Sequence, residues 1–179
     1  MVSIDYVNTF IAVAPDLTAV TGTVPPERGG TPIVASRTWQ MIADEPCRYT
    51  SGDVTFTVYA ERAGIARTTG PRLAAREQYY SVGRACLRSS DLDKRYGLGV
   101  HADAEGRVAL YAVGSRDYGA LAAGATPDSE PVALTRAMRC KRAGARERNV
   151  SVRAGARERN APVRARWVGK CPTWVRMNS

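Results

Sequence analysis

The 179-residue chain has a single histidine, His101, and its four cysteines, at positions 47, 86, 140 and 171, form no CxxC pair. Zinc sites and disulfide-rich scaffolds repeat such residues at short spacings, so neither is indicated, and we expect four reduced thiols. No apolar run approaches the roughly 18 residues of a membrane helix. The first residues also lack the basic start of a secretory signal. We therefore expect a cytoplasmic protein with no metal, no cofactor and no membrane partner.

The formal net charge of +9 is concentrated at the C-terminal end of the chain. Residues 144–179 hold nine Lys/Arg and two Glu, whereas residues 1–143 hold seventeen Lys/Arg and fifteen Asp/Glu. Within this basic region the octapeptide RAGARERN, at 142–149, recurs at 153–160. A segment with almost no large apolar residues before Trp167 buries too little surface to offset its ordering entropy. We expect a disordered tail that is dispensable for folding and binds nucleic acid at most weakly and non-specifically.

Residues 1–143 are expected to form one α+β domain, in which an antiparallel β-hairpin packs against short helices. Alternating apolar residues predict strands at 9–14 and at 53–60, and residues 84–88 can return as a strand. Helices are expected at 36–42, 71–81 and 131–142. Ser115 is predicted to cap a further short helix that ends before Gly124.

The hairpin is predicted from the segments GLGVHAD and RVALYAV, which are joined by a short turn ending in Gly106. A three-residue loop at 104–106 places His101 opposite Ala109 and Gly99 opposite Tyr111, and it places Asp103 opposite Arg107. Because side chains alternate along a strand, one face carries Leu98, Val100 and Ala102. The other face carries Gly97, Gly99, His101 and Asp103.

The hairpin face that carries His101 is the best candidate site. In a functional interpretation, the two glycines clear a shallow floor beside an imidazole that exchanges protons near neutral pH, with Asp103 able to orient it. In a packing interpretation, Tyr111 fills the space that the missing side chain of Gly99 leaves. The sequence leaves both interpretations open.

Arginines and a lysine surround the connection that leads into this hairpin, at positions 84, 88, 94 and 95. Such groups hold a phosphate or a carboxylate, or they form a solvated loop balanced by Asp91 and Asp93. The leading hypothesis is a domain that binds a small anionic or polar ligand through Arg88, Lys94, Arg95, His101 and Tyr111.

Two other functions stay open. One is a hydrolase-like enzyme in which His101, assisted by Asp103, acts as general base, with Cys86 as a possible nucleophile. The other is weak nucleic-acid binding by the tail. A metal site built from His101, Asp103 and Asp53 has too few assured ligands for a transition metal.

Several segments together resemble the uncharacterised bacterial family DUF6157. They are Thr9 with Phe10, PPERGG at 25–30, YTSGDVTFTVYAER at 49–62, CLRSSDLDKRYGLGVHADAEGRVALY at 86–111 and AMRCKRA at 137–143. The resemblance covers residues 1–143 and implies one domain, but it brings no activity with it. Gly52 stands where the family usually has aspartate, and Leu98 where it usually has tryptophan. The tail has no counterpart, so it is either a natural extension or the product of a shifted reading frame.

Overall fold

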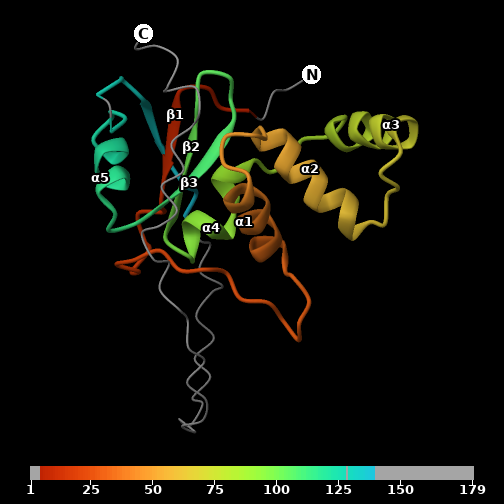
Figure 1. Cartoon of the computed structure of the whole chain (residues 1–179), viewed down its shortest axis with the longest axis horizontal. Helices are drawn as coiled ribbons and strands as arrows, with labels where there is room; N and C mark the ends of the chain where they lie inside the picture. The colour runs from red at the N-terminus through yellow and green to blue at the C-terminus, as the bar shows by residue number, and fades with distance from the viewer. Residues whose placement is uncertain (1–4, 128, 140–179) are drawn as a thin grey trace, which may run out of the picture.

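The computed structural model describes residues 5–127 and 129–139 and has the expected α+β architecture. Four strands form one mixed sheet in the order β3-β2-β1-β4, with helices on both faces (Figure 1). The strands are β1 (Thr9–Ala12), β2 (Leu98–Ala102), β3 (Val108–Ala112) and β4 (Ala133–Arg136). The helices are α1 (Val34–Asp44), α2 (Ser51–Arg62), α3 (Thr69–Tyr80), α4 (Asp91–Lys94) and α5 (Arg116–Ala122), with a short 3-10 helix η1 (Leu87–Ser89).

The β2–β3 hairpin is confirmed with its predicted register. Gly99 pairs with Tyr111, and His101 pairs with Ala109. The turn ends at Gly106, whose φ of 75° lies in the left-handed region where glycine has no steric cost. The local sequence therefore specifies this part of the fold.

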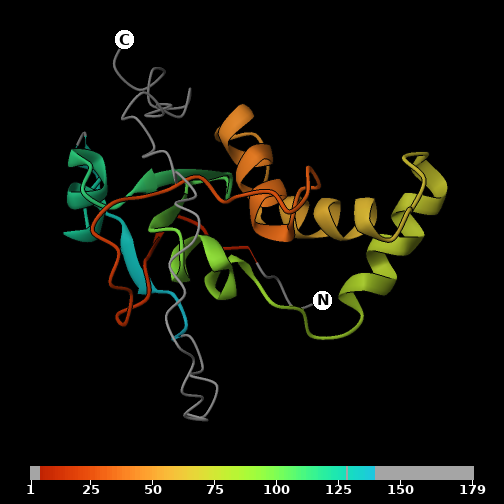
Figure 2. The ribbon, with the colours of Figure 1, turned by 90° about the horizontal axis from the view of Figure 1, so that it is seen from below.

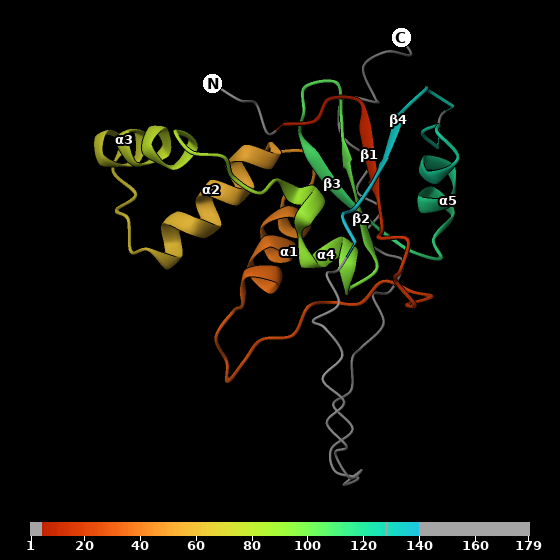
Figure 3. The ribbon, with the colours of Figure 1, turned by 180° about the vertical axis from the view of Figure 1, so that it is seen from behind.

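The central strand β1 is antiparallel to β2 and parallel to β4. Its side chains alternate between two hydrophobic clusters on opposite faces of the sheet. Ile11 belongs to a cluster with residues of α1, α2 and α4, whereas Phe10 belongs to a cluster with residues of α5. Figure 3 shows α5 on one side of the sheet and α1, α2 and α4 on the other. Both faces of the hairpin are consequently covered.

Residues 53–60, predicted as a strand, lie within helix α2, so that prediction is wrong. The Thr50 hydroxyl accepts a hydrogen bond from the Asp53 N–H at 3.2 Å, and the Asp53 carboxylate accepts one from the Thr50 N–H at 3.1 Å. This capping box starts the helix. Residues two apart in a helix lie about 200° apart, so Val54 and Phe56 point in nearly opposite directions. The alternation arises because α2 packs on two sides, with Val54 in the core and Phe56 against Tyr79 of α3.

The helix predicted at 131–142 is also wrong, because this segment contains β4. The strand pairs in parallel with β1, and the Ala133 N–H donates to the Asn8 carbonyl at 2.9 Å. Leu134 and Met138, whose spacing suggested a buried helix face, are 45% and 53% exposed. Residues 140–142 of the predicted helix, and the tail at 144–179, lie outside the described residues.

The remaining helix predictions are confirmed with shifted ends, whereas the strand at 84–88 is not found. Residues 84–86 have no regular secondary structure, and residues 87–88 belong to η1. Helix α1 begins at Val34, and Ser36 lies inside its first turn, where its hydroxyl donates to the Ile33 carbonyl at 3.0 Å. Ser115 caps α5 as predicted, since its hydroxyl accepts from the Tyr118 N–H at 3.2 Å.

The two cysteines within the described residues differ in state. Cys86 is a free thiol, but Cys47 is disulfide-bonded, so the expectation of four reduced thiols is wrong. Among residues 5–127 and 129–139, no helix has both the length and the hydrophobicity needed to cross a bilayer.

Candidate functional site

The hairpin face chosen from the sequence lies in the interior. His101 is only 3% exposed, and its Nδ1 has no hydrogen-bond partner among the described residues. Burial lowers the pKa of His101 below its usual value, although Asp103 opposes this effect. Tyr111 is 8% exposed, and burial raises its pKa to about 12. Both side chains are therefore neutral at pH 7 and removed from solvent.

The glycine opposite Tyr111 makes room for protein side chains. A Cβ atom on Gly99 would lie 2.5 Å from Cζ of Phe10 and 2.9 Å from Cε2 of Tyr118. The Phe10 ring meets Tyr118 edge-on with 5.2 Å between ring centroids, and it meets Tyr111 edge-on at 6.4 Å. Aromatic rings thus fill the space that the functional interpretation assigned to a ligand.

Asp103 organises the hairpin turn. Its Oδ1 accepts hydrogen bonds from the N–H groups of Glu105 at 3.0 Å and Arg107 at 2.7 Å. Its Oδ2 lies 3.2 Å from Nε of Arg107, an ion pair that does not have hydrogen-bond geometry. No hydrogen bond joins Asp103 to His101 within the described part of the chain, so the pair lacks the contact that would orient a general base.

The other chemistries weighed from the sequence also find no assembled site. The Cys86 thiol lies 3.8 Å from the Tyr6 hydroxyl, and no hydrogen bond links it to His101 in residues 5–127 and 129–139. Asp53 lies in the capping box of α2 and pairs with Arg76. The residues that the structure describes contain no group of three potential metal ligands.

The three basic residues predicted to bind an anion each have a partner within the protein. Nε of Arg88 donates to the Arg136 carbonyl at 2.7 Å, and Nζ of Lys94 donates to the Ser89 carbonyl at 2.8 Å. Arg95 lies 3.4 Å from the Asp91 carboxylate. The structure does not bring these three side chains together with His101 and Tyr111.

A different set of charged and aromatic side chains gathers between α2 and α3. We call it the arginine–aromatic cluster, and its members are Phe56, Tyr59, Arg72, Arg76, Tyr79, Tyr80 and Arg84. Helix α3 has no buried residue and stands away from the sheet, next to α2 (Figure 2). The helix face toward α2 carries Arg72, Arg76 and Tyr80. These residues are four apart in sequence, and residues at this spacing lie on one face of a helix.

The rings of this cluster pack against one another, and Phe56 is 1% exposed. Tyr79 lies 5.8 Å from Phe56, 4.5 Å from Tyr59 and 4.8 Å from Tyr80 between centroids. Burial raises the pKa of Tyr79, opposed by the charge of Arg84, and burial also raises the pKa of Tyr80. These phenols stay protonated at pH 7, so they carry no negative charge that would repel an anion.

The three guanidinium groups lie over these rings. Cζ of Arg84 is 4.4 Å from the Tyr79 centroid, and Cζ of Arg72 is 5.3 Å from that of Phe56. Arg76 lies 5.6 Å from both Phe56 and Tyr80. Cation–π contacts of this kind hold a guanidinium group in place while its N–H groups remain available for binding.

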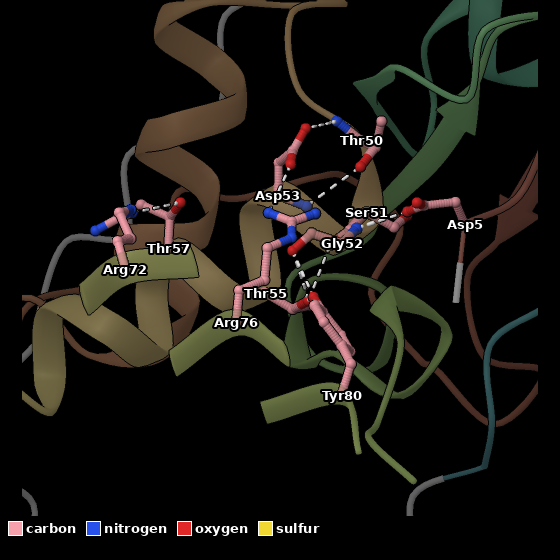
Figure 4. A network of polar contacts seen from close by, with 10 residues as sticks. All are labelled: Asp5, Thr50, Ser51, Gly52, Asp53, Thr55, Thr57, Arg72, Arg76 and Tyr80. Carbon is pink, nitrogen blue, oxygen red and sulfur yellow. Dashed lines mark hydrogen bonds and ion pairs between the residues drawn. The ribbon is translucent and has the colours of Figure 1, made fainter. Parts of the chain in front are cut away.

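The arginines differ in their polar partners. Nη1 of Arg76 pairs with the Asp53 carboxylate at 2.9 Å (Figure 4). Nη2 of Arg72 donates to the Thr57 hydroxyl at 3.2 Å, while its buried Nη1 has no partner among the described residues. Nε of Arg84 donates to the Tyr79 carbonyl at 2.7 Å, and Arg84 is exposed. No carboxylate in residues 5–127 and 129–139 forms an ion pair with Arg72 or Arg84.

A polar network fixes α3 against the start of α2. The Tyr80 hydroxyl donates to the Gly52 carbonyl at 2.6 Å and lies 3.1 Å from the Thr55 hydroxyl. The Gly52 N–H donates to Oδ1 of Asp5 at 2.6 Å, as Figure 4 shows. Three segments that are distant in sequence therefore meet beside the cluster. Their contacts hold Tyr80, and with it the helix that carries Arg76.

Comparison with known proteins agrees with the resemblance noted in the sequence. The chain matches the family described as "Family of unknown function (DUF6157)" over residues 1–143. The chain belongs to DUF6157. No curated protein and no solved structure matches it.

The structure also describes the surroundings of Leu98 and Gly52, where the resemblance implies other residues. Leu98 is 2% exposed and belongs to the hydrophobic core, so this position fills the interior and does not line a ligand pocket. Gly52, in contrast, lies next to the carboxylate of Asp5. A Cβ atom there would lie 3.3 Å from Oδ1 of Asp5 and 3.4 Å from the Tyr80 hydroxyl.

Sequence reasoning missed the arginine–aromatic cluster because it treated residues 53–60 as a strand. In a strand, Phe56 and Tyr59 point to opposite faces, whereas in a helix residues three apart are neighbours. Two signals were available in this DUF6157 sequence. One is the Thr50–Asp53 spacing of a capping box, and the other is the spacing of four from Arg72 to Arg76 to Tyr80.

Proposed function

We propose that this domain binds small anions, such as phosphate- or carboxylate-bearing metabolites, through the arginine–aromatic cluster. The observation that carries the proposal is the environment of Arg84. Its guanidinium group is exposed, lies over the Tyr79 ring and has its Nε fixed by a backbone carbonyl. The two terminal nitrogens of Arg84 form no ion pair with a carboxylate of the described residues, and they carry the donor geometry that suits a planar or tetrahedral anion.

Preorganisation supports this site over the hairpin loop. Binding to a flexible arginine orders its side chain and costs about 0.5 to 1.5 kcal/mol. In the cluster much of that ordering is already present, because ring contacts and hydrogen bonds hold Arg72 and Arg84 in the free protein. At the hairpin loop, by contrast, an anion would compete with the Asp91 carboxylate for Arg95.

Charge supports the same choice. Arg76 and Asp53 largely neutralise each other, which leaves Arg72 and Arg84 as the cations of the cluster without an ion-pair partner in the described residues. An anion with two or three oxygens would supply acceptors to the guanidinium N–H groups. The mechanism is binding by charge-assisted hydrogen bonds.

Isothermal titration of the full chain with pyrophosphate and with citrate, at low ionic strength, tests the proposal. Arg72→Gln and Arg84→Gln should each weaken binding by about tenfold or more, because a charge-assisted hydrogen bond contributes about 1.5 to 3 kcal/mol. Arg116→Gln is the matched control, since Arg116 is an exposed arginine on α5, on the far side of the sheet (Figure 1). Equal affinity of all variants would assign the binding to cations elsewhere, including the basic tail, and would overturn the proposal.

A further inference from the structure

The most anomalous buried group among the described residues is the carboxyl of Asp93. Asp93 lies in α4 and is 0% exposed. Neither of its carboxyl oxygens has a side-chain hydrogen-bond partner in the part of the chain that the structure describes, and the only hydrogen-bond donors there that favour its ionised form are the backbone N–H groups of its own helical turn. Buried polar groups are nearly always hydrogen-bonded, so an exception of this kind calls for an explanation.

A loop is attached to the backbone of Asp93 at the end of the sheet. Residues 13–23, which we call the cover segment, follow β1 and cross the start of β2. The Ala14 N–H donates to the Asp93 backbone carbonyl at 3.0 Å, and the Thr23 N–H donates to the Tyr96 carbonyl at 2.8 Å. The Val13 N–H donates to the Tyr118 hydroxyl at 3.1 Å. These contacts hold the cover segment against α4, β2 and α5.

The charged groups around Asp93 do not stabilise its ionised form enough to offset burial. Burial raises the pKa of Asp93 to about 8, although the backbone N–H groups of Asp93 and Lys94 and the charge of Lys94 lower it. The charge of Asp91, on the same helix, raises it further. From α5, the nearby titratable group is Tyr118, whose own pKa is raised mainly by burial and is affected by both Arg136 and Asp93. The cover segment contributes Asp16, which is exposed. A neutral carboxylic acid is therefore the form that fits the closed arrangement.

We propose that Asp93 is a proton-operated latch, in which opening of the cover segment is coupled to loss of the Asp93 proton. In the closed arrangement the carboxyl is dry and protonated. When the segment lifts, water reaches the carboxyl, which then ionises as an ordinary aspartate. The cover segment can lift without breaking a strand or a helix, because it contains neither and is attached through the hydrogen bonds of Val13, Ala14 and Thr23.

The pH range of the latch follows from linkage. The open form has the ordinary aspartate pKa of about 3.9, whereas the closed form has a pKa of about 8. Between these values the open form binds fewer protons, so the opening equilibrium rises about tenfold per pH unit. Above about pH 8 both forms are ionised and the equilibrium no longer changes. Acidic conditions thus keep the segment closed, and mildly alkaline conditions favour its opening.

Solvent-exchange rates of backbone amides, measured by NMR from pH 5 to pH 9 on the full chain, test the latch. After correction for the intrinsic exchange rate, protection of the Ala14 and Thr23 amides should fall about tenfold per pH unit up to about pH 8 and then level off. Asp93→Asn, which keeps a neutral side chain of the same shape, should remove this pH dependence. The control Asp91→Asn should keep it, because Asp91 is not buried.

The amide of Val100, in the core strand β2, separates local opening from global unfolding. Because Asp93 is also exposed and ionised in the unfolded chain, the protection of Val100 should have the same pH slope, but it should be much larger than that of Ala14 and Thr23 at every pH. Equal protection at all three amides would show that the segment opens only when the whole domain unfolds and would overturn the latch. The same pH dependence in wild type and Asp93→Asn would overturn it equally.

Discussion

The Gly52 N–H donates a hydrogen bond of 2.6 Å to Oδ1 of Asp5, which lies 47 residues earlier in the chain. Gly52 is in the first turn of α2, where backbone N–H groups have no partner within the helix. The Asp5 carboxylate satisfies one of them and places a negative charge at the positive end of the helix. A residue before the first strand thereby stabilises the helix that carries Phe56 and Tyr59 of the arginine–aromatic cluster.

Gly52→Asp should destabilise the domain, although the family resemblance implies aspartate at this position. The new carboxylate would begin from a Cβ atom 3.3 Å from Oδ1 of Asp5, so two like charges would crowd together. We expect a loss of about 1 to 3 kcal/mol in urea denaturation. Adding Asp5→Asn should restore part of that loss. If the double variant is less stable than Gly52→Asp alone, the two carboxylates do not repel each other as described.

Thr50→Ala should cost about 1 kcal/mol of unfolding free energy, because it removes one half of the capping box of α2. Thr68→Ala is the matched control. Thr68 is the N-cap of α3, but its side chain makes no capping hydrogen bond. Chemical denaturation should therefore show a much smaller loss for Thr68→Ala, and similar losses for both variants would argue against the capping role of Thr50.

His101→Ala should cost about 2 to 3 kcal/mol, because it leaves a cavity beneath α5. An exposed imidazole would cost less than about 0.5 kcal/mol, so the stability of this variant separates a core histidine from a surface site. A value near zero would return the hairpin face to consideration as a binding surface.

The pH dependence of His101 has a definite sign. Burial lowers the pKa of the folded protein's His101, so below about pH 6.5 the unfolded chain binds the extra proton. Stability should then fall as the pH drops from about 6.5 through the folded-state pKa. The raised pKa of Asp93 acts in the opposite direction and stabilises the domain as the pH falls, so the effect of His101 is read from a difference. In urea titrations at pH 7 and pH 5, the stability of the wild type relative to His101→Ala should be lower at pH 5. An equal change in both would assign the pH effect to other groups.

The parts of the fold that the sequence predicted are those whose signals are local. Gly106 at the turn and alternation on both sides define the hairpin, and Ser115 defines the start of α5. The failures arose from contacts between distant segments. β4 is a strand because it pairs with β1, more than a hundred residues earlier, and the alternation in α2 reflects packing on two sides. The site was missed for the same reason, since Phe56 and Tyr59 meet Tyr79 only when α2 is helical.

The central claim is that anions bind between α2 and α3 and not at the hairpin. The most direct measurement is a titration of the 15N-labelled full chain with pyrophosphate, followed by backbone and arginine Nε–H chemical shifts. We predict the largest shifts at Arg72, Arg84 and Tyr79, with little change at Arg95 and His101. Shifts confined to residues 94–111, or to the basic tail, would contradict the account.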